Sequence, residues 1–106
     1  MSDQIQASHI LVSYDQAQNS SSQIIKEDAL EHIENLKSRL QTGSKFSEVA
    51  REFSDCPSAE KGGDLGVFGR GAMVPAFDAA AFDLEIGEVS DVVESEFGYH
   101  LIYRTN

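Results

Sequence analysis

The chain has 106 residues, a length typical of one domain, which we expect to span residues 1–106. Its 18 acidic and 8 basic side chains give a formal net charge of −10, which argues against a nucleic-acid partner because phosphate contacts require lysine and arginine. The single cysteine excludes an internal disulfide, and no apolar run approaches the roughly 20 residues needed to cross a bilayer.

Residues 4–14 predict the first strand. Ile10 and Val12 alternate with their neighbours at the two-residue period of a strand. Because Ile10, Leu11 and Val12 are consecutive apolar residues, we expect this strand to be buried on both faces, as a central strand is. Residues 15–23 follow as a polar run without lysine or arginine, which predicts a flexible loop.

Two helices are predicted next. The first carries an apolar stripe at three- and four-residue steps, the pattern of an amphipathic helix, and Gly43 provides its stop signal. Ser44 is expected to cap the second, shorter helix. The stripe of the first helix comprises Ile25, Ala29, Ile33, Leu36 and Leu40, and the inward residues of the second are Phe46, Val49, Ala50 and Phe53.

The second half of the chain predicts a turn-rich loop, a further helix and three strands. Residues 54–63 read as the loop, and residues 65–68 as a short strand between glycines. Pro75 is suited to the first position of the next helix. Two strands follow at residues 89–94 and 99–104, joined by a turn. This order of elements predicts an α+β fold in which helices cover a sheet.

Five of the eight glycines fall within residues 62–73. A phosphate-binding loop would end in Gly-Lys-Ser/Thr, and a dinucleotide site would show G-x-G-x-x-G after a strand; the sequence matches neither. Glycine allows sharp turns and leaves space beside neighbouring side chains. We therefore expect a small hydrophobic pocket formed by Leu65, Phe68, Met73 and Phe77.

Five stretches together resemble one known family. They are SHILV at residues 8–12, FSDCPSAEKGGDLGVFGRGAM at 53–73, PAFDAAAF at 75–82, GEVS at 87–90 and FGYHLI at 97–102. Their order and spacing are similar to those of the parvulins, a family of peptidyl-prolyl cis-trans isomerases. The resemblance implies a four-stranded antiparallel sheet flanked by about four helices, a shallow proline-binding site, and no cofactor.

The resemblance also implies a role for individual residues. It places a catalytic pair at His9 and His100, and a central polar residue at Cys56. It implies a substrate-binding group of Leu65, Met73, Phe77, Ser95 and Phe97, of which the first three would grip the proline. By residue type alone, a histidine in an apolar strand is more often a core residue, and Cys56 is as often a small buried one. A zinc site formed by these three residues lacks the close paired spacing of zinc motifs, so no metal is expected.

One departure from the family bears on the substrate. Phosphate-directed parvulins carry basic residues in the loop after the first strand, whereas residues 15–23 contain none, and Ser13 stands where a lysine would be expected. We therefore expect no requirement for a phosphorylated residue before proline. Pro57 is also less usual, and it biases Cys56 toward an extended backbone.

These observations predict an isomerase of Xaa-Pro bonds that assists protein folding. Its partners would be proline-containing peptides and unfolded proteins, with no nucleic acid and no membrane, and we expect a monomer. The N-terminal residues lack the features of a signal peptide, which favours a cytoplasmic location, although a domain cut from a longer secreted protein would look the same. The alternative is a binding module that holds proline-containing segments with little turnover.

Overall fold

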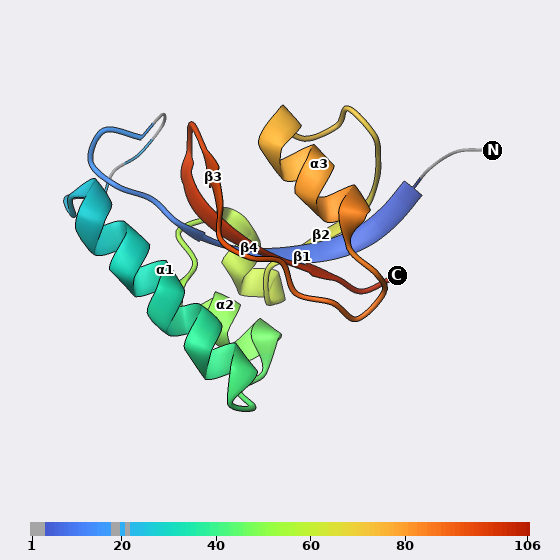
Figure 1. The fold of residues 1–106 in the computed structure, drawn as a ribbon, viewed down its shortest axis with the longest axis horizontal. Coiled ribbons are helices and arrows are strands. Elements are labelled where there is room, and N and C mark those ends of the chain that lie inside the picture. The colour runs from blue at the N-terminus through green and yellow to red at the C-terminus, as the bar shows by residue number, and fades with distance from the viewer. Residues whose placement is uncertain (1–3, 18–19, 21) are drawn as a thin grey trace.

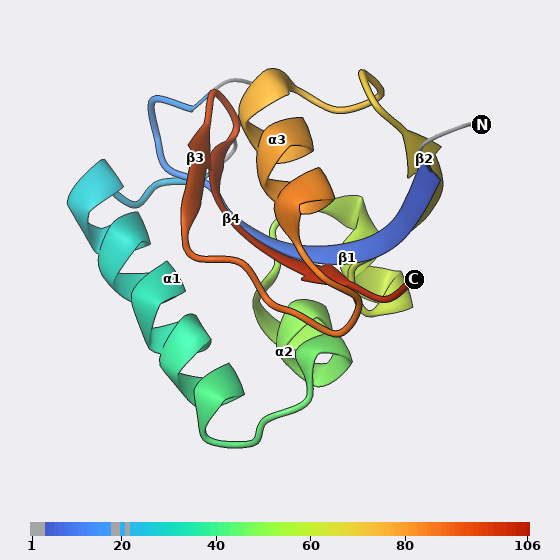
Figure 2. The same ribbon diagram turned by 45° about the vertical axis from the view of Figure 1, so that its right-hand side comes forward.

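The structure is a computed structural model that describes residues 4–17, 20 and 22–106. It has three layers, with a twisted antiparallel sheet between α1 and α2 on one face and α3 on the other (Figures 1 and 2). The elements are β1 (Gln4–Val12), α1 (Lys26–Gln41), α2 (Phe46–Phe53), the 3-10 helix η1 (Pro57–Lys61), β2 (Asp64–Gly69), α3 (Pro75–Asp83), β3 (Val93–Ser95) and β4 (Gly98–Arg104). The expected α+β fold with a four-stranded sheet is confirmed, and three α-helices together with η1 approximate the expected four.

The strands are arranged in the order β2-β1-β4-β3, so β1 and β4 are central. This confirms the prediction from the apolar run in β1, where Ile10 and Val12 are at most 1% exposed. β1 and β4 pair in a register that places Leu11 opposite His100 and His9 opposite Ile102. His9 and His100 are therefore diagonal neighbours on the same face of the sheet.

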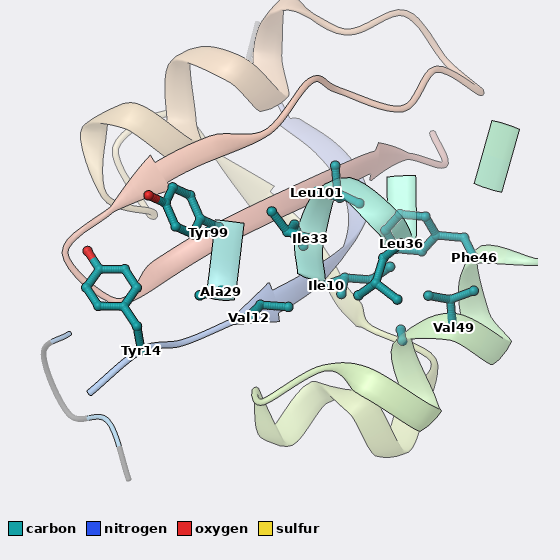
Figure 3. Close-up of a cluster of buried hydrophobic side chains, with 11 residues drawn as sticks. Ile10, Val12, Tyr14, Ala29, Ile33, Leu36, Phe46, Val49, Tyr99 and Leu101 are labelled. Atoms are coloured by element: carbon teal, nitrogen blue, oxygen red, sulfur yellow. The ribbon is translucent and has the colours of Figure 1, made fainter. Parts of the chain in front are cut away.

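The first hydrophobic core lies between the sheet and the helices α1 and α2. Figure 3 shows Ile33 and Leu36 reaching from α1 toward Ile10 and Leu101 of the sheet, and all four are at most 1% exposed. The predicted stripe is thus confirmed in its middle. The prediction that the stripe begins at Ile25 was wrong, because Ile25 is 50% exposed and precedes the helix as its N-cap.

Two further boundaries differ from the predictions. Lys45, not Ser44, is the N-cap of α2, and no side chain caps the helix. The strand expected from residue 89 begins only at Val93, because residues 87–90 run beside β4 with irregular pairing. There Ser90 N–H donates to the carbonyl of Ile102, and Val89 forms an isolated bridge with Tyr103.

The second core lies between the sheet and α3. It is formed by Ile5, Ala7, Phe68, Phe77, Ala81, Leu84 and Ile102, with Leu65 and Met73 partly buried against it. Its aromatic rings come from two elements, β2 and α3. Within the described part of the chain, no helix is both long and apolar enough to cross a bilayer.

Candidate active site

The two histidines of the central strands meet on the face of the sheet that carries α3. Their Nδ1 atoms are 3.2 Å apart, and their rings stack with centroids separated by 5.4 Å. His100 also bonds Ser95, whose Oγ lies 2.7 Å from Nε2. His9 is 6% exposed and His100 4% exposed, so the pair is shielded from bulk water. The strand register, which fixes both backbones, brings the pair together.

Burial keeps both imidazoles neutral near pH 7. It lowers the pKa of His9 from 6.5 to about 3, with a smaller contribution from His100. Burial alone lowers the pKa of His100 from 6.5 to about 4. A charged ring would lose its hydration here and gain no carboxylate partner from the described part of the chain, where each histidine bonds only neutral groups.

The hydrogen bonds couple the tautomers of the two rings. If the Ser95 hydroxyl donates to Nε2 of His100, then His100 donates from Nδ1 to His9, and His9 carries its proton on Nε2. In the opposite arrangement His9 donates from Nδ1, and its Nε2 is a bare acceptor. Among the described residues, none bonds Nε2 of His9 although that atom is buried. The direction of the hydrogen bond between Ser95 and His100 therefore decides whether Nε2 of His9 is a donor or an acceptor.

Phe77 of α3 closes the apolar side of the pair. Its ring meets His9 and His100 edge to face, with centroids 5.5 Å and 5.3 Å apart. Phe77 is only 3% exposed and belongs to the second core with Leu65 and Met73. The structure thus brings together the three residues expected to hold proline. Phe77 is buried beneath the surface, whereas Leu65 and Met73 are only partly buried and more accessible.

The segment that carries Cys56 is attached to the end of β1. The backbone N–H of Leu11 donates to Oγ of Ser54 at 3.0 Å, and the N–H of Asp55 donates to the carbonyl of Leu11 at 2.7 Å. Oδ2 of Asp55 accepts from the N–H of Ser13 at 2.9 Å. Cys56 follows, half-buried, with the extended backbone that Pro57 was expected to favour (φ −87°, ψ 143°).

Gly63 allows the other end of this segment to approach β1 closely. Its carbonyl accepts from the N–H of His9 at 2.9 Å, and its φ is +86°. A Cβ atom at this position would lie 2.3 Å from the carbonyl oxygen of His9. Glycine is therefore required both by the backbone conformation and by the space.

A cavity of about 500 Å³ opens beside the histidines. Four predicted site residues line it: His9, Cys56, Phe97 and His100; the other lining residues are Leu11, Ser13, Ser20, Ser22, Asp55 and Pro57. Leu65, Met73 and Phe77 do not line it, and neither does Ser95, which bonds His100. The expected single pocket is thus divided into a polar cavity and an apolar patch, with the histidines between them.

Sequence reasoning missed Ser54 and Asp55, and it considered Ser13 only as the position of an absent lysine. Serine and aspartate side chains readily bond nearby backbone N–H groups, and two of these residues stand directly before Cys56. That position was the available signal, but the partners of Ser54 and Asp55 are Leu11 in β1 and Ser13 directly after it, both more than forty residues away. No group of three or more His, Cys, Asp or Glu side chains among the described residues could hold a metal ion.

Comparison with known proteins agrees with this arrangement. The family model described as Rotamase, PPIC-type PPIase domain, matches residues 9–106. The chain therefore belongs to the family of PPIC-type peptidyl-prolyl cis-trans isomerase domains, the parvulins. A solved structure of the peptidyl-prolyl isomerase ESS1 from Candida albicans superimposes with a TM-score of 0.91 at 34% identity, over 97% of this chain and 63% of that one.

Three relatives define what the chain resembles. It is 46% identical to the peptidyl-prolyl cis-trans isomerase ESS1 of Saccharomyces cerevisiae, over 91% of this chain and 62% of that protein. It is 40% identical to the peptidyl-prolyl cis-trans isomerase Pin1 of Arabidopsis thaliana, over 97% and 96%. It is 47% identical to the foldase protein PrsA of Halalkalibacterium halodurans, over 97% and 27%. The chain thus spans less than two thirds of the first and third of these proteins.

Proposed function

We propose that this chain catalyses cis-trans rotation about Xaa-Pro bonds in unfolded or flexible protein segments and so assists their folding. One observation carries the proposal: a buried, neutral histidine pair separates an apolar patch from a polar cavity that contains Cys56. The relatives named as isomerases and as a foldase support the activity and the folding role.

The reaction requires no bond to break. Rotation loses amide resonance, which costs about 18–20 kcal/mol without a catalyst. A site that holds the proline ring, excludes water and presents fixed polar groups to the twisted amide lowers that barrier. A reduction of about 5–7 kcal/mol would accelerate rotation roughly 10⁴- to 10⁵-fold.

Each part of the site fits one of these tasks. The proline would lie against Met73 and Leu65, above the ring of Phe77. Its preceding amide would lie over Cys56 and the histidines, whose mutual hydrogen bond holds them in place. Because both histidines are neutral and bonded to neutral partners, we assign them a positioning role rather than proton transfer. Cys56 adjusts the polarity near the carbonyl without attacking it.

The charges around the cavity support a reaction that is independent of phosphate. Among the described residues that line it there is no lysine or arginine, and Asp55 is the one acidic side chain. A dianionic phosphate on the residue before proline would meet a carboxylate there and no cation. This agrees with the absence of basic residues from positions 15–23.

A protease-free NMR exchange experiment tests the activity directly. The peptide Ala-Ala-Xaa-Pro-Phe gives separate cis and trans signals, and a catalytic amount of the protein should broaden or exchange them. Shift changes without faster exchange would show instead the binding module that holds proline segments. Neither effect, in a folded sample, would refute both functions.

The folding role has its own test. The protein should accelerate the slow, proline-limited refolding phase of an unrelated substrate protein, and heat-inactivated protein should not. An unchanged slow phase, together with activity on peptides, would remove the folding role alone. The cytoplasmic location and the monomeric state stay predictions.

A further inference from the structure

Asp55 is the one acidic side chain among the described residues that line the polar cavity. The cavity combines the hydroxyls of Ser13, Ser20 and Ser22 with the apolar surfaces of Leu11 and Phe97. The histidines add no charge, because burial holds them neutral. A ligand side chain in this cavity therefore meets one carboxylate and several neutral groups.

Asp55 is held in a fixed orientation. Its own N–H donates to the carbonyl of Leu11 at 2.7 Å, and Oδ2 accepts from the N–H of Ser13 at 2.9 Å. Within the described part of the chain, no residue donates to Oδ1. One oxygen thus holds the side chain to the backbone directly after β1, while the other is available to a ligand.

The surrounding sequence leaves this carboxylate without a basic neighbour in the adjoining loop. Residues 15–23 border the cavity through Ser20 and Ser22, and their only charged side chain is Asp15. The next basic residue along the chain, Lys26, is paired with Glu94 at 2.7 Å. A cationic ligand would therefore find its electrostatic partner at Asp55 without competition from this loop.

The order of the parts fixes which substrate residue meets Asp55. Phe77 contacts the histidines from the patch, whereas Cys56 and Asp55 line the cavity beyond them. A proline on the patch, with its rotating amide over the histidines, places the residue before proline in the cavity. A lysine or arginine stem could there lie on Leu11 and Phe97 with its charged end toward Oδ1 of Asp55.

From this geometry we propose that Asp55 is a specificity-determining residue, which makes the site prefer lysine or arginine directly before proline. The proposal rests on the isomerase function proposed above. It concerns the substrate class and not the chemical step, since Asp55 meets the side chain before the amide rather than the amide itself.

The experiment compares the peptides Ala-Ala-Xaa-Pro-Phe with Xaa as Lys, Gln or Glu, by NMR exchange at low salt. For the wild-type protein we expect kcat/KM for Lys to exceed that for Gln by roughly 2- to 5-fold, the range of an exposed ion pair, with Glu lowest. The preference should shrink in 0.5 M NaCl, since screening at about that concentration is strong. Asp55→Asn, which keeps an oxygen for the N–H of Ser13, should bring Lys and Gln within error of each other.

The matched control is Asp83→Asn on α3, an exposed residue outside the cavity whose replacement changes the net charge equally. It should leave the Lys to Gln ratio as in the wild type. Equal rates for Lys, Gln and Glu in the wild type, or an unchanged ratio in Asp55→Asn, would overturn the proposal while leaving isomerase activity standing. If no peptide is turned over, the proposed function fails, and the same three peptides still test Asp55 through their affinities in a chemical-shift titration.

Discussion

Mild acid should destabilise this domain through its buried histidine pair. His9 and His100 have pKa values of about 3 and about 4 in the folded protein, against an ordinary value of 6.5. Below pH 6.5 the unfolded chain takes up protons on both residues, whereas the folded protein does not until the pH approaches 4. The pair's contribution is therefore complete above pH 6.5 and is lost as the pH falls toward 4 and below.

The size of the effect at pH 5 follows from the distance to the unfolded pKa. That distance is about 1.5 pH units, and each unit changes the unfolding free energy by about 1.4 kcal/mol per histidine. At pH 5 each histidine therefore lowers the unfolding free energy by about 2 kcal/mol, and the pair by about 4 kcal/mol. A domain of this size has a total stability of roughly 5–15 kcal/mol. Acidification from pH 8 to pH 5 should thus remove a large part of the stability before most carboxylates titrate.

Urea unfolding at pH 8 and pH 5 measures this loss. The difference in unfolding free energy between the two pH values should shrink by about 2 kcal/mol in His100→Gln and by about 4 kcal/mol in the double variant with His9→Gln. His32→Gln, a replacement on α1 outside the pair, should leave the pair's contribution in place. If the double variant loses as much stability on acidification as the wild type, the pair is not held neutral by burial and the reasoning is wrong.

Four other outcomes are expected. Met73→Ala, at a partly buried position of the patch, should weaken peptide binding by ~1–2 kcal/mol in an NMR titration. Val67→Ala, at an exposed position of β2, should leave the affinity unchanged. If Met73→Ala binds the peptide as tightly as the wild type, the patch does not hold proline. Gly63→Ala should cost at least ~2 kcal/mol in urea unfolding, because its Cβ would lie 2.3 Å from the His9 carbonyl oxygen; a neutral result would contradict that contact. Cys56→Asp should retain measurable exchange activity, and complete loss in a folded variant would indicate sulfur chemistry. A phosphoserine before proline should not raise kcat/KM over serine, and a tenfold gain would refute independence from phosphate.

Much of the fold could be predicted because the apolar patterns along the chain agree with burial in the folded protein. The apolar run of Ile10 to Val12 predicted a central strand, and the spacing of Ile33 and Leu36 predicted the buried face of α1; both are confirmed. The predicted ends of the elements were wrong where burial does not determine the backbone conformation. Ile25 continues the apolar spacing but lies before the first turn, half exposed.

The site was harder to predict because it depends on contacts distant in sequence. His9 and His100 are ninety-one residues apart, and only the strand register makes them diagonal neighbours. Their nomination came from the family resemblance, since periodicity alone favoured core residues. Asp55 shows the same limit, because its proposed role depends on an orientation fixed by a hydrogen bond from Ser13 that no local pattern specifies.

The arrangement separates two physical demands that a prolyl isomerase faces. In the proposed function, rotation of the amide is favoured by a dry and fixed setting, which the buried, neutral histidines and Phe77 would provide. The proposed selection of lysine or arginine before proline relies instead on charge, which Asp55, an exposed side chain, brings to the cavity. Because the charge lies outside the buried part, changing it should alter which peptides bind without altering the pair. The cost of the neutral setting is sensitivity to acid, since the histidines that keep the site fixed are also those that an unfolded chain protonates first.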